Sequence, residues 1–151
     1  MIAGVIDYGA GNLQSVCNAL DALGVERKLV SGGDALDGID ALIFPGVGAF
    51  GDCARNLEER ALMGPLREWI AADRPFLGIC IGYQMLFEAS EESPGATGVG
   101  AFGGKVVRFR SQANLKVPHM GWNHLELTDS SDAAWSGLGD SPYFYFVHSY
   151  F

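Results

Sequence analysis

The stretch that decides the fold lies at residues 75–87 and reads Pro75-Phe76-Leu77-Gly78-Ile79-Cys80-Ile81-Gly82-Tyr83-Gln84-Met85-Leu86-Phe87. An apolar run precedes Gly78 and an amphipathic helical pattern follows Gln84, which predicts that Cys80 lies on a sharp turn from a strand to a helix. A thiol there projects toward the first amides of the helix, whose dipole favours the thiolate. Side chains at Gly78 and Gly82 would collide with the turned backbone or with a substrate. We therefore predict that Cys80 is a nucleophile; the alternative is a buried structural cysteine.

A second glycine-rich segment follows another apolar run and reads Phe44-Pro45-Gly46-Val47-Gly48-Ala49-Phe50-Gly51. If the strands are parallel, this segment lies on the same edge of the sheet as Cys80. A thiolate that attacks a carbonyl group needs N–H donors for the oxyanion that develops. The amides of Ile81 and of Val47 or Gly48 are the natural donors, and the alternative for this segment is an ordinary glycine-rich turn.

The order of the apolar runs predicts an α/β fold. The predicted strands lie at 2–6, 25–30, 41–44 and 75–80, and the helices between them lie at 13–23, 52–60 and 66–72. Strands that are apolar on both faces indicate a doubly wound, mostly parallel sheet with flanking helices. No helical pattern separates the later strands, predicted at 105–109, 122–127 and 143–150. We therefore expect an antiparallel extension in the C-terminal third of a single domain, residues 1–151.

The composition argues against several classes of function. The chain has 151 residues, of which 48% are apolar, as suits one packed soluble domain. Its net charge of -8, without a cluster of Lys and Arg, argues against nucleic acid as a partner. The sequence has no apolar run of membrane-spanning length and no leader pattern, so we expect no membrane association and a cytoplasmic location. Three widely spaced cysteines indicate reduced thiols, with neither a disulfide framework nor a metal site.

Several segments resemble the class I (triad) glutamine amidotransferases, whose fold is flavodoxin-like. The pattern Gly78-x-Cys80-x-Gly82-x-Gln84 and the segment Pro45-Gly46-x-Gly48 carry this resemblance. Within the family, the chain is most similar to the glutaminase subunits whose partner cyclase makes imidazole glycerol phosphate in histidine biosynthesis. The segments that carry this closer similarity are Asp7-Tyr8-Gly9-Ala10-Gly11-Asn12, Pro45-Gly46-Val47-Gly48-Ala49-Phe50, Phe87-Glu88-Ala89-Ser90-Glu91-Glu92, Lys116-Val117-Pro118-His119-Met120-Gly121-Trp122-Asn123 and Tyr145-Phe146-Val147-His148-Ser149-Tyr150.

The resemblance implies the chemistry and the substrate site. Cys80 would attack the side-chain amide of glutamine, form a γ-glutamyl thioester and release ammonia, without a cofactor. The residues that would serve the oxyanion are Val47, Gly48 and Ile81. Those that would hold the rest of the glutamine are Gln84, Glu92, His148, Ser149 and Tyr150. A carboxylate such as Glu92 suits the ammonium group of an amino acid; the alternative for Glu92 is a solvated loop acid.

The resemblance also implies a protein partner, a (β/α)8-barrel cyclase that receives the ammonia through its interior. The residues that would face this partner are Asn12, Met120, Trp122 and Tyr145. Trp and Tyr are common anchors of interfaces, and they are also common in protein cores.

The chain departs from the family pattern in its base. Class I members carry a His-x-Glu pair, which takes and returns the proton, some dozens of residues after a segment like 145–150. This sequence stops at Phe151, within an apolar strand pattern. We therefore expect a truncated C-terminus, poor glutamine hydrolysis and reduced solubility. His124-Leu125-Glu126 has the right spacing, but it lies in a strand pattern of the segment that would face the partner, which argues against a substitute triad.

Two other functions stay open. One is another cysteine hydrolase with the same elbow, such as a γ-glutamyl hydrolase or a different amidotransferase. The other is a catalytically incomplete fragment that only binds the cyclase. A dinucleotide-binding fold is disfavoured, because Gln14 stands where the third glycine would follow Gly9 and Gly11.

Overall fold

A computed structural model describes residues 1–111, 115–128, 133–139 and 141–151. The chain divides into two compact units, Met1–Val107 and Arg108–Phe151. The first unit contains Cys80 and the glycine-rich loops, and the second contains a β-hairpin.

The first unit is built around a parallel sheet with strand order β2-β1-β3-β4. Its strands are β1 (Ile2–Ile6), β2 (Glu26–Val30), β3 (Ala41–Gly46) and β4 (Phe76–Cys80). From β1 the chain adds β2 on one side and then β3 and β4 on the other. The carboxyl ends of β1 and β3 therefore form a topological switch point, where sheets of this kind bind ligands. The predicted doubly wound parallel sheet is confirmed.

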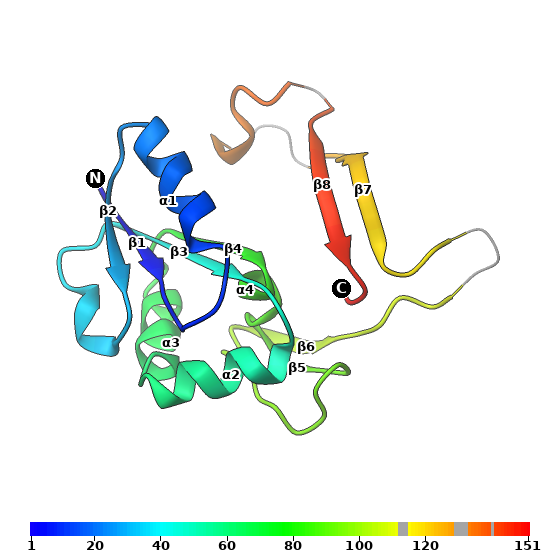
Figure 1. Cartoon of the computed structure of the whole chain (residues 1–151), viewed down its shortest axis with the longest axis horizontal. Helices are drawn as coiled ribbons and strands as arrows, with labels where there is room; N and C mark the ends of the chain where they lie inside the picture. The colour runs from blue at the N-terminus through cyan, green and yellow to red at the C-terminus, as the bar shows by residue number, and fades with distance from the viewer. Residues whose placement is uncertain (112–114, 129–132, 140) are drawn as a thin grey trace. The chain divides into compact units, whose positions relative to one another are not determined.

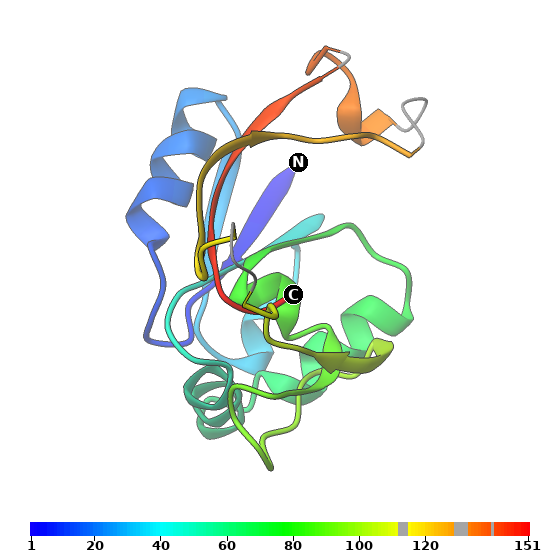
Figure 2. The same cartoon turned by 90° about the vertical axis from the view of Figure 1, so that its right-hand side faces the viewer.

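Helices cover both faces of this sheet (Figure 1). One face carries α1 (Leu13–Ala22), and the other carries α2 (Phe50–Glu59) and α3 (Met63–Ala71). The alternation of side chains along β1 explains the arrangement: Ala3 and Val5 pack with Leu20 of α1, whereas Ile6 belongs to the core under α2 and α3. Figure 2 shows the same two sides after a quarter turn. A short 3-10 helix, η1 (Gly33–Leu36), leads from β2 toward β3.

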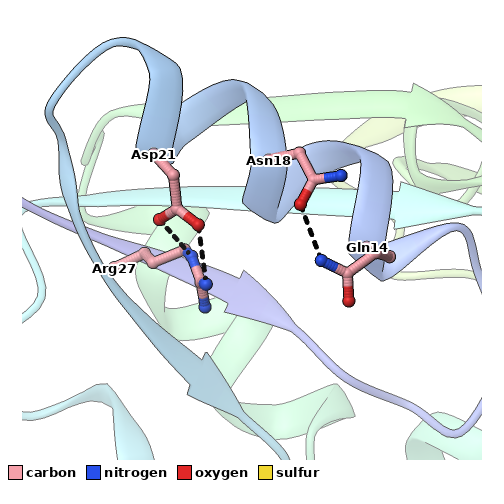
Figure 3. A network of polar contacts seen from close by, with 4 residues as sticks. All are labelled: Gln14, Asn18, Asp21 and Arg27. Atoms are coloured by element: carbon pink, nitrogen blue, oxygen red, sulfur yellow. Dashed lines mark hydrogen bonds and ion pairs between the residues drawn. The ribbon is translucent and has the colours of Figure 1, made fainter.

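The outer side of α1 carries exposed polar contacts (Figure 3). Gln14 Nε2 donates a hydrogen bond to Asn18 Oδ1, one helical turn away, at 2.6 Å. Arg27 of β2 donates two hydrogen bonds to the Asp21 carboxylate, at 2.8 and 3.0 Å. The two bonds from Arg27 connect α1 to the edge strand of the sheet.

The predicted helix after Cys80 is much shorter in the structure than the sequence pattern indicates. It consists of one turn, α4 (Ile81–Gln84), and the chain then enters β5 (Phe87–Ser90). Residues that looked like a helical continuation instead pair with β6 (Phe102–Val106) in a parallel two-stranded sheet. The rings of Phe87 and Phe102, 5.9 Å apart between centroids, hold this pair together. The strand predicted at 105–109 overlaps β6 only at Lys105 and Val106, and β6 runs parallel to β5, whereas Arg108 forms an antiparallel bridge with Tyr150.

The second unit contains an antiparallel hairpin, as predicted for the C-terminal third. Its strands are β7 (His119–His124) and β8 (Tyr143–His148), and a 3-10 turn, η2 (Ala133–Trp135), lies between them in sequence. The two strands form a two-stranded sheet of their own, and they cover only part of the ranges predicted at 122–127 and 143–150. None of the helices in the described ranges is long and apolar enough to cross a membrane.

Candidate active site

Cys80 lies at the junction of β4 and α4, where the sequence predicts it. Its backbone angles, φ 55° and ψ -113°, fall in a region that residues with a side chain rarely adopt. The strand register places Cys80 opposite Gly46, so the loops that follow β3 and β4 start side by side. Cys80 is exposed, whereas Cys17 and Cys53 are buried. A buried structural cysteine is therefore the wrong interpretation of Cys80.

Three glycines allow this turn. A β-carbon at Gly78 would lie 2.7 Å from the Cα of Tyr83, and one at Gly46 would lie 2.7 Å from the Cβ of Ile81. A β-carbon at Gly82 would overlap the carbonyl oxygen of Phe44. These neighbours are backbone atoms or β-carbons, which no side-chain rotation can move away. The collisions predicted at positions 78 and 82 are therefore collisions with the turned backbone itself.

The pKa of the Cys80 thiol is raised, contrary to the prediction that the following helix favours the thiolate. Although Cys80 is exposed, partial desolvation of its sulfur raises this pKa, the hydrogen bond from the Ile81 amide lowers it, and the charge of Glu92 raises it. Because α4 has a single turn, it aligns few peptide dipoles and does little to lower the pKa of Cys80. A raised pKa disfavours the thiolate, so a general base would assist the attack of this sulfur on a carbonyl group.

The loop after β3 carries the other predicted oxyanion donors. The Val47 N–H donates a hydrogen bond to Tyr8 Oη at 3.2 Å, so this amide points toward a buried side chain. Gly48 is exposed and has a φ of 90°, which suits glycine. Within the described ranges we find no acceptor for the Gly48 amide.

Glu92 is bound to the start of α2. Its Oε2 accepts a hydrogen bond from the Phe50 N–H at 2.8 Å, and the neighbouring Ser93 Oγ accepts one from the Gly51 N–H at 2.9 Å. Ala49 at the N-cap position gives α2 no side-chain cap, so the loop at 92–93 takes that role. Glu92 is therefore not a solvated loop acid, and its charge acts on Cys80. Gln84, the last residue of α4, is buried.

The other predicted substrate residues belong to the second unit, at the end of β8. His148 Nδ1 lies 2.8 Å from the Tyr150 carbonyl oxygen. The Phe109 N–H donates a hydrogen bond to the Ser149 carbonyl oxygen at 3.0 Å. Arg108 and Tyr150 form an antiparallel bridge, so the first residue of the second unit pairs with a residue near its end.

The predicted partner-facing residues are exposed. Met120, Trp122 and Tyr145 have exposed fractions of 61%, 68% and 54%. They lie on one face of the hairpin, since Trp122 pairs with Tyr145 and Met120 is two residues from Trp122. Asn12, in the first unit, is also exposed, and its Oδ1 accepts a hydrogen bond from the Ser15 N–H at the start of α1.

The His124–Glu126 pair does not have the features of a catalytic pair. Nε2 of His124 lies 4.0 Å from Oε1 of Glu126, and Glu126 is almost fully exposed. Both side chains are exposed to solvent rather than enclosed in a pocket. Among the described residues, no group of three or more His, Cys, Asp or Glu side chains is arranged to hold a metal ion.

Tyr8 and Ser93 contact the site and are absent from the sequence-based predictions. Tyr8 follows β1 at the switch point, which is a positional signal for a site residue. Ser93 follows Glu92 directly and has no signal of its own, because its partner on α2 lies 42 residues away.

Comparisons with known proteins agree with this geometry. Residues 4–151 match the family model for glutamine amidotransferase class-I. The imidazole glycerol phosphate synthase subunit HisH of Trichodesmium erythraeum is 47% identical over 147 residues, which are 97% of this chain and 68% of that protein. The same subunit of Gloeothece citriformis is 45% identical over 150 residues, 99% of this chain and 71% of that one. A crystal structure of a glutamine amidotransferase has a TM-score of 0.75 at 23% identity, covers 99% of this chain and 72% of its own, and supports the fold.

Proposed function

Because the chain belongs to the class I glutamine amidotransferases, and within them to the glutaminase subunits of imidazole glycerol phosphate synthase, we propose that Cys80 is the nucleophile that attacks glutamine. The chain is thus an enzyme subunit of histidine biosynthesis. The observation that carries the proposal is the left-handed backbone of Cys80 at the carboxyl end of β4, beside the loop that follows β3. Such an elbow exposes a nucleophile next to backbone N–H groups.

The proposed reaction proceeds through a thioester. The sulfur of Cys80 attacks the side-chain carbonyl carbon of glutamine, and the carbonyl electron pair moves onto oxygen. The Ile81 amide and an amide of the 47–48 loop stabilise this oxyanion. When the oxyanion collapses, the carbon–nitrogen bond breaks, the nitrogen takes the proton that the thiol has lost, and ammonia leaves. Water then hydrolyses the thioester, which releases glutamate and restores the thiol.

The remaining predicted residues bind the amino-acid end of glutamine in this proposal. Glu92, which is anchored through Oε2, offers Oε1 to the α-ammonium group. The other residues assigned to this end are Gln84, His148, Ser149 and Tyr150. We also propose that the 151-residue form hydrolyses glutamine slowly, because the pKa of Cys80 is raised and the one His-x-Glu spacing in the sequence is the exposed pair at His124.

A (β/α)8-barrel cyclase is the proposed recipient of the ammonia. The exposed hairpin face with Met120, Trp122 and Tyr145 supports this part of the proposal, because exposed aromatic side chains are frequent anchors of interfaces. The Trp122 and Tyr145 rings meet edge to face, with centroids 5.6 Å apart. The cytoplasmic location stays part of the proposal, since the relatives are biosynthetic enzymes.

The experiment is a measurement of glutamate and ammonia release from glutamine, with and without the cyclase. Cys80→Ala is expected to abolish both the release and any γ-glutamyl adduct in the intact mass. Cys17→Ala removes a thiol that is buried in α1 and serves as the matched control. If Cys80→Ala leaves the release unchanged, Cys80 is not the nucleophile and a pure cyclase-binding role gains support. Turnover equal to that of a longer relative contradicts the proposal of slow hydrolysis.

A further inference from the structure

A cavity of about 880 Å³ lies in the first unit, in a groove between η1 and α3. It is lined by the loop after β2, by η1, by the end of α2 and by the face of α3 that contains Pro65, Trp69 and Ala72. Its volume is within the range of small-molecule sites, roughly 300–1,000 Å³. The described residues that line it include no residue of the candidate active site. The cavity is therefore a separate candidate for ligand binding.

Contacts between the two walls show how the groove runs. A β-carbon at Gly33 would lie 2.9 Å from Pro65 Cγ, so the start of η1 packs against the start of α3. After the end of α3, Arg74 donates a hydrogen bond to the Ile39 carbonyl oxygen, shortly before β3. The groove therefore runs along α3, from the loop after β2 to Arg74.

Arg60, the C-cap residue of α2, provides a positive charge at the first end. Its guanidinium group lies over Gly9, where a β-carbon would be 2.5 Å from Arg60 Nη2. Among the described residues, no carboxylate is within ion-pair distance of Arg60. Ser31, which follows β2 directly, adds a hydroxyl group to the same end. A guanidinium fork beside a hydroxyl group suits the oxygens of a phosphate group.

The second end of the groove offers a flat surface for stacking. The Cζ atom of Arg74 lies 3.3 Å from the centre of the Trp69 ring, so the guanidinium group is stacked on the indole. Trp69 is buried, and its Nε1 donates a hydrogen bond to the Pro75 carbonyl oxygen at 3.1 Å. Trp69 thus covers one face of the guanidinium group, while Arg74 is exposed and lines the cavity. An aromatic base can stack on such a guanidinium plane.

The walls between the two ends restrict the charge of a ligand. Leu36 and Pro65 are apolar, whereas Asp37 and Glu68 carry carboxylates. Carboxylates accept hydrogen bonds from hydroxyl groups and repel a second negative charge. The net charge of -8 also means that the chain does not attract anions at long range. The groove therefore suits a ligand with one anionic head, hydroxyl groups in its middle and an aromatic ring.

We propose that the groove binds a nucleoside monophosphate, with its phosphate group on Arg60 and Ser31. The base stacks on the face of Arg74 that Trp69 does not cover, and the ribose hydroxyl groups donate hydrogen bonds to Asp37 and Glu68. This site goes beyond the proposed glutaminase function, and its test does not involve Cys80.

The test is isothermal titration calorimetry of the chain with AMP, adenosine, ribose 5-phosphate and inorganic phosphate at one ionic strength. We expect one AMP to bind per chain with a dissociation constant below about 1 mM, and each of the other three compounds to bind at least about tenfold more weakly. Absence of AMP binding at millimolar concentrations overturns the proposal. Binding of AMP no tighter than that of inorganic phosphate or of adenosine also overturns it, because one end of the groove then contributes nothing.

Arg60→Gln tests the phosphate end. The loss of a charged hydrogen-bond donor should weaken AMP binding by at least about tenfold. Arg55→Gln is the matched control, because Arg55 is an exposed arginine of α2 that pairs with Asp52 and does not line the cavity. We expect Arg55→Gln to keep the wild-type affinity. If the two variants lose the same affinity, AMP responds only to the overall charge, and the proposal fails.

Ala72→Trp tests the opposite end, at the exposed C-cap residue of α3. The added ring occupies the part of the groove where the base would stack. We expect AMP to bind at least about tenfold more weakly, while ribose 5-phosphate keeps its affinity. Unchanged AMP binding in Ala72→Trp contradicts the proposal even if Arg60→Gln does not fold, and circular dichroism shows which variants are folded.

Discussion

The two faces of the four-stranded sheet are covered to different degrees. The face under α2 and α3 is closed: Leu42 and Phe44 of β3 are fully buried there, together with Leu57, Leu66 and Met85. The face that carries α1 has a small core of Ala3, Val5 and Leu20. At the end of that face, Leu77 and Ile79 of β4 are 54% and 41% exposed.

The difference shows what supports the candidate site. Ile81, the first residue of the one-turn helix, and Met85, which directly follows it, belong to the closed core under α2 and α3. The elbow at Cys80 and the capped start of α2 are therefore attached to the rigid side of the sheet. The α1 face contributes little to this support. Substitutions on the closed face should accordingly affect stability and chemistry far more than matched substitutions on the other.

The largest expected contrast is between two leucines on neighbouring strands. Leu42→Ala removes a side chain from the closed core and is expected to lower the free energy of unfolding by about 2–5 kcal/mol. Leu77→Ala removes an exposed side chain from the other face and should cost less than about 1 kcal/mol. Urea titration followed by circular dichroism measures both. Equal losses would contradict the difference between the two faces.

The glycine that lies against β3 gives the next contrast. Gly82→Ala places a methyl group on the Phe44 carbonyl oxygen, and the resulting shift of the elbow should cost about 1–3 kcal/mol or more. Gly64→Ala, in α3, meets no atom within 4 Å and should stabilise the chain slightly, because alanine favours helices. Gly82→Ala is expected to lower the melting temperature, and Gly64→Ala is expected to raise it. A neutral Gly82→Ala would mean that the elbow has room to relax.

Local patterns explain which parts of this arrangement could be predicted. Short stretches of sequence determine the elbow at Cys80 and the parallel strands. A cysteine between two glycines and a continuous apolar run are each compatible with few local structures. The end of α4 after Gln84 depends on the pairing of β5 with β6, and a loop separates these two strands in sequence. The contact of Val47 with Tyr8 spans 39 residues, and that of Glu92 with Phe50 spans 42.

The raised pKa of Cys80 has the same origin. It depends on how the folded chain desolvates the sulfur and where it places Glu92, and neither is visible in the residues around Cys80. Sequence patterns alone therefore predicted the position of the thiol and gave the wrong direction for its pKa. The backbone at Cys80 therefore has the geometry of a nucleophile elbow, whereas the raised pKa of the thiol disfavours the reactive thiolate.

A smaller effect is expected at Glu92, where a single substitution can remove the charge and keep the hydrogen bond that caps α2. Glu92→Gln keeps an oxygen that can accept from the Phe50 N–H, but it removes the negative charge that raises the pKa of Cys80. Because the thiolate is the reactive form, the alkylation rate rises as pH passes through this pKa. The midpoint of that rise should move to lower pH in Glu92→Gln. Glu88→Gln, at an acid that bonds the Gly104 N–H, is the control and should leave the midpoint in place.

The smallest effect belongs to the α1 face, at the ion pair between Asp21 and Arg27. The hydrogen bonds from Arg27 lower the pKa of Asp21 in the folded chain. The charged carboxylate therefore stabilises the fold above the ordinary pKa of aspartate, and this contribution is lost as pH falls through the lowered value. Asp21→Asn should make the melting temperature slightly less sensitive to acid, and high salt should remove the difference, because both side chains are exposed. A loss as large as that of Leu42→Ala would show that α1 is held to β2 by this pair rather than by its apolar contacts, and the two faces would then differ in kind rather than in degree.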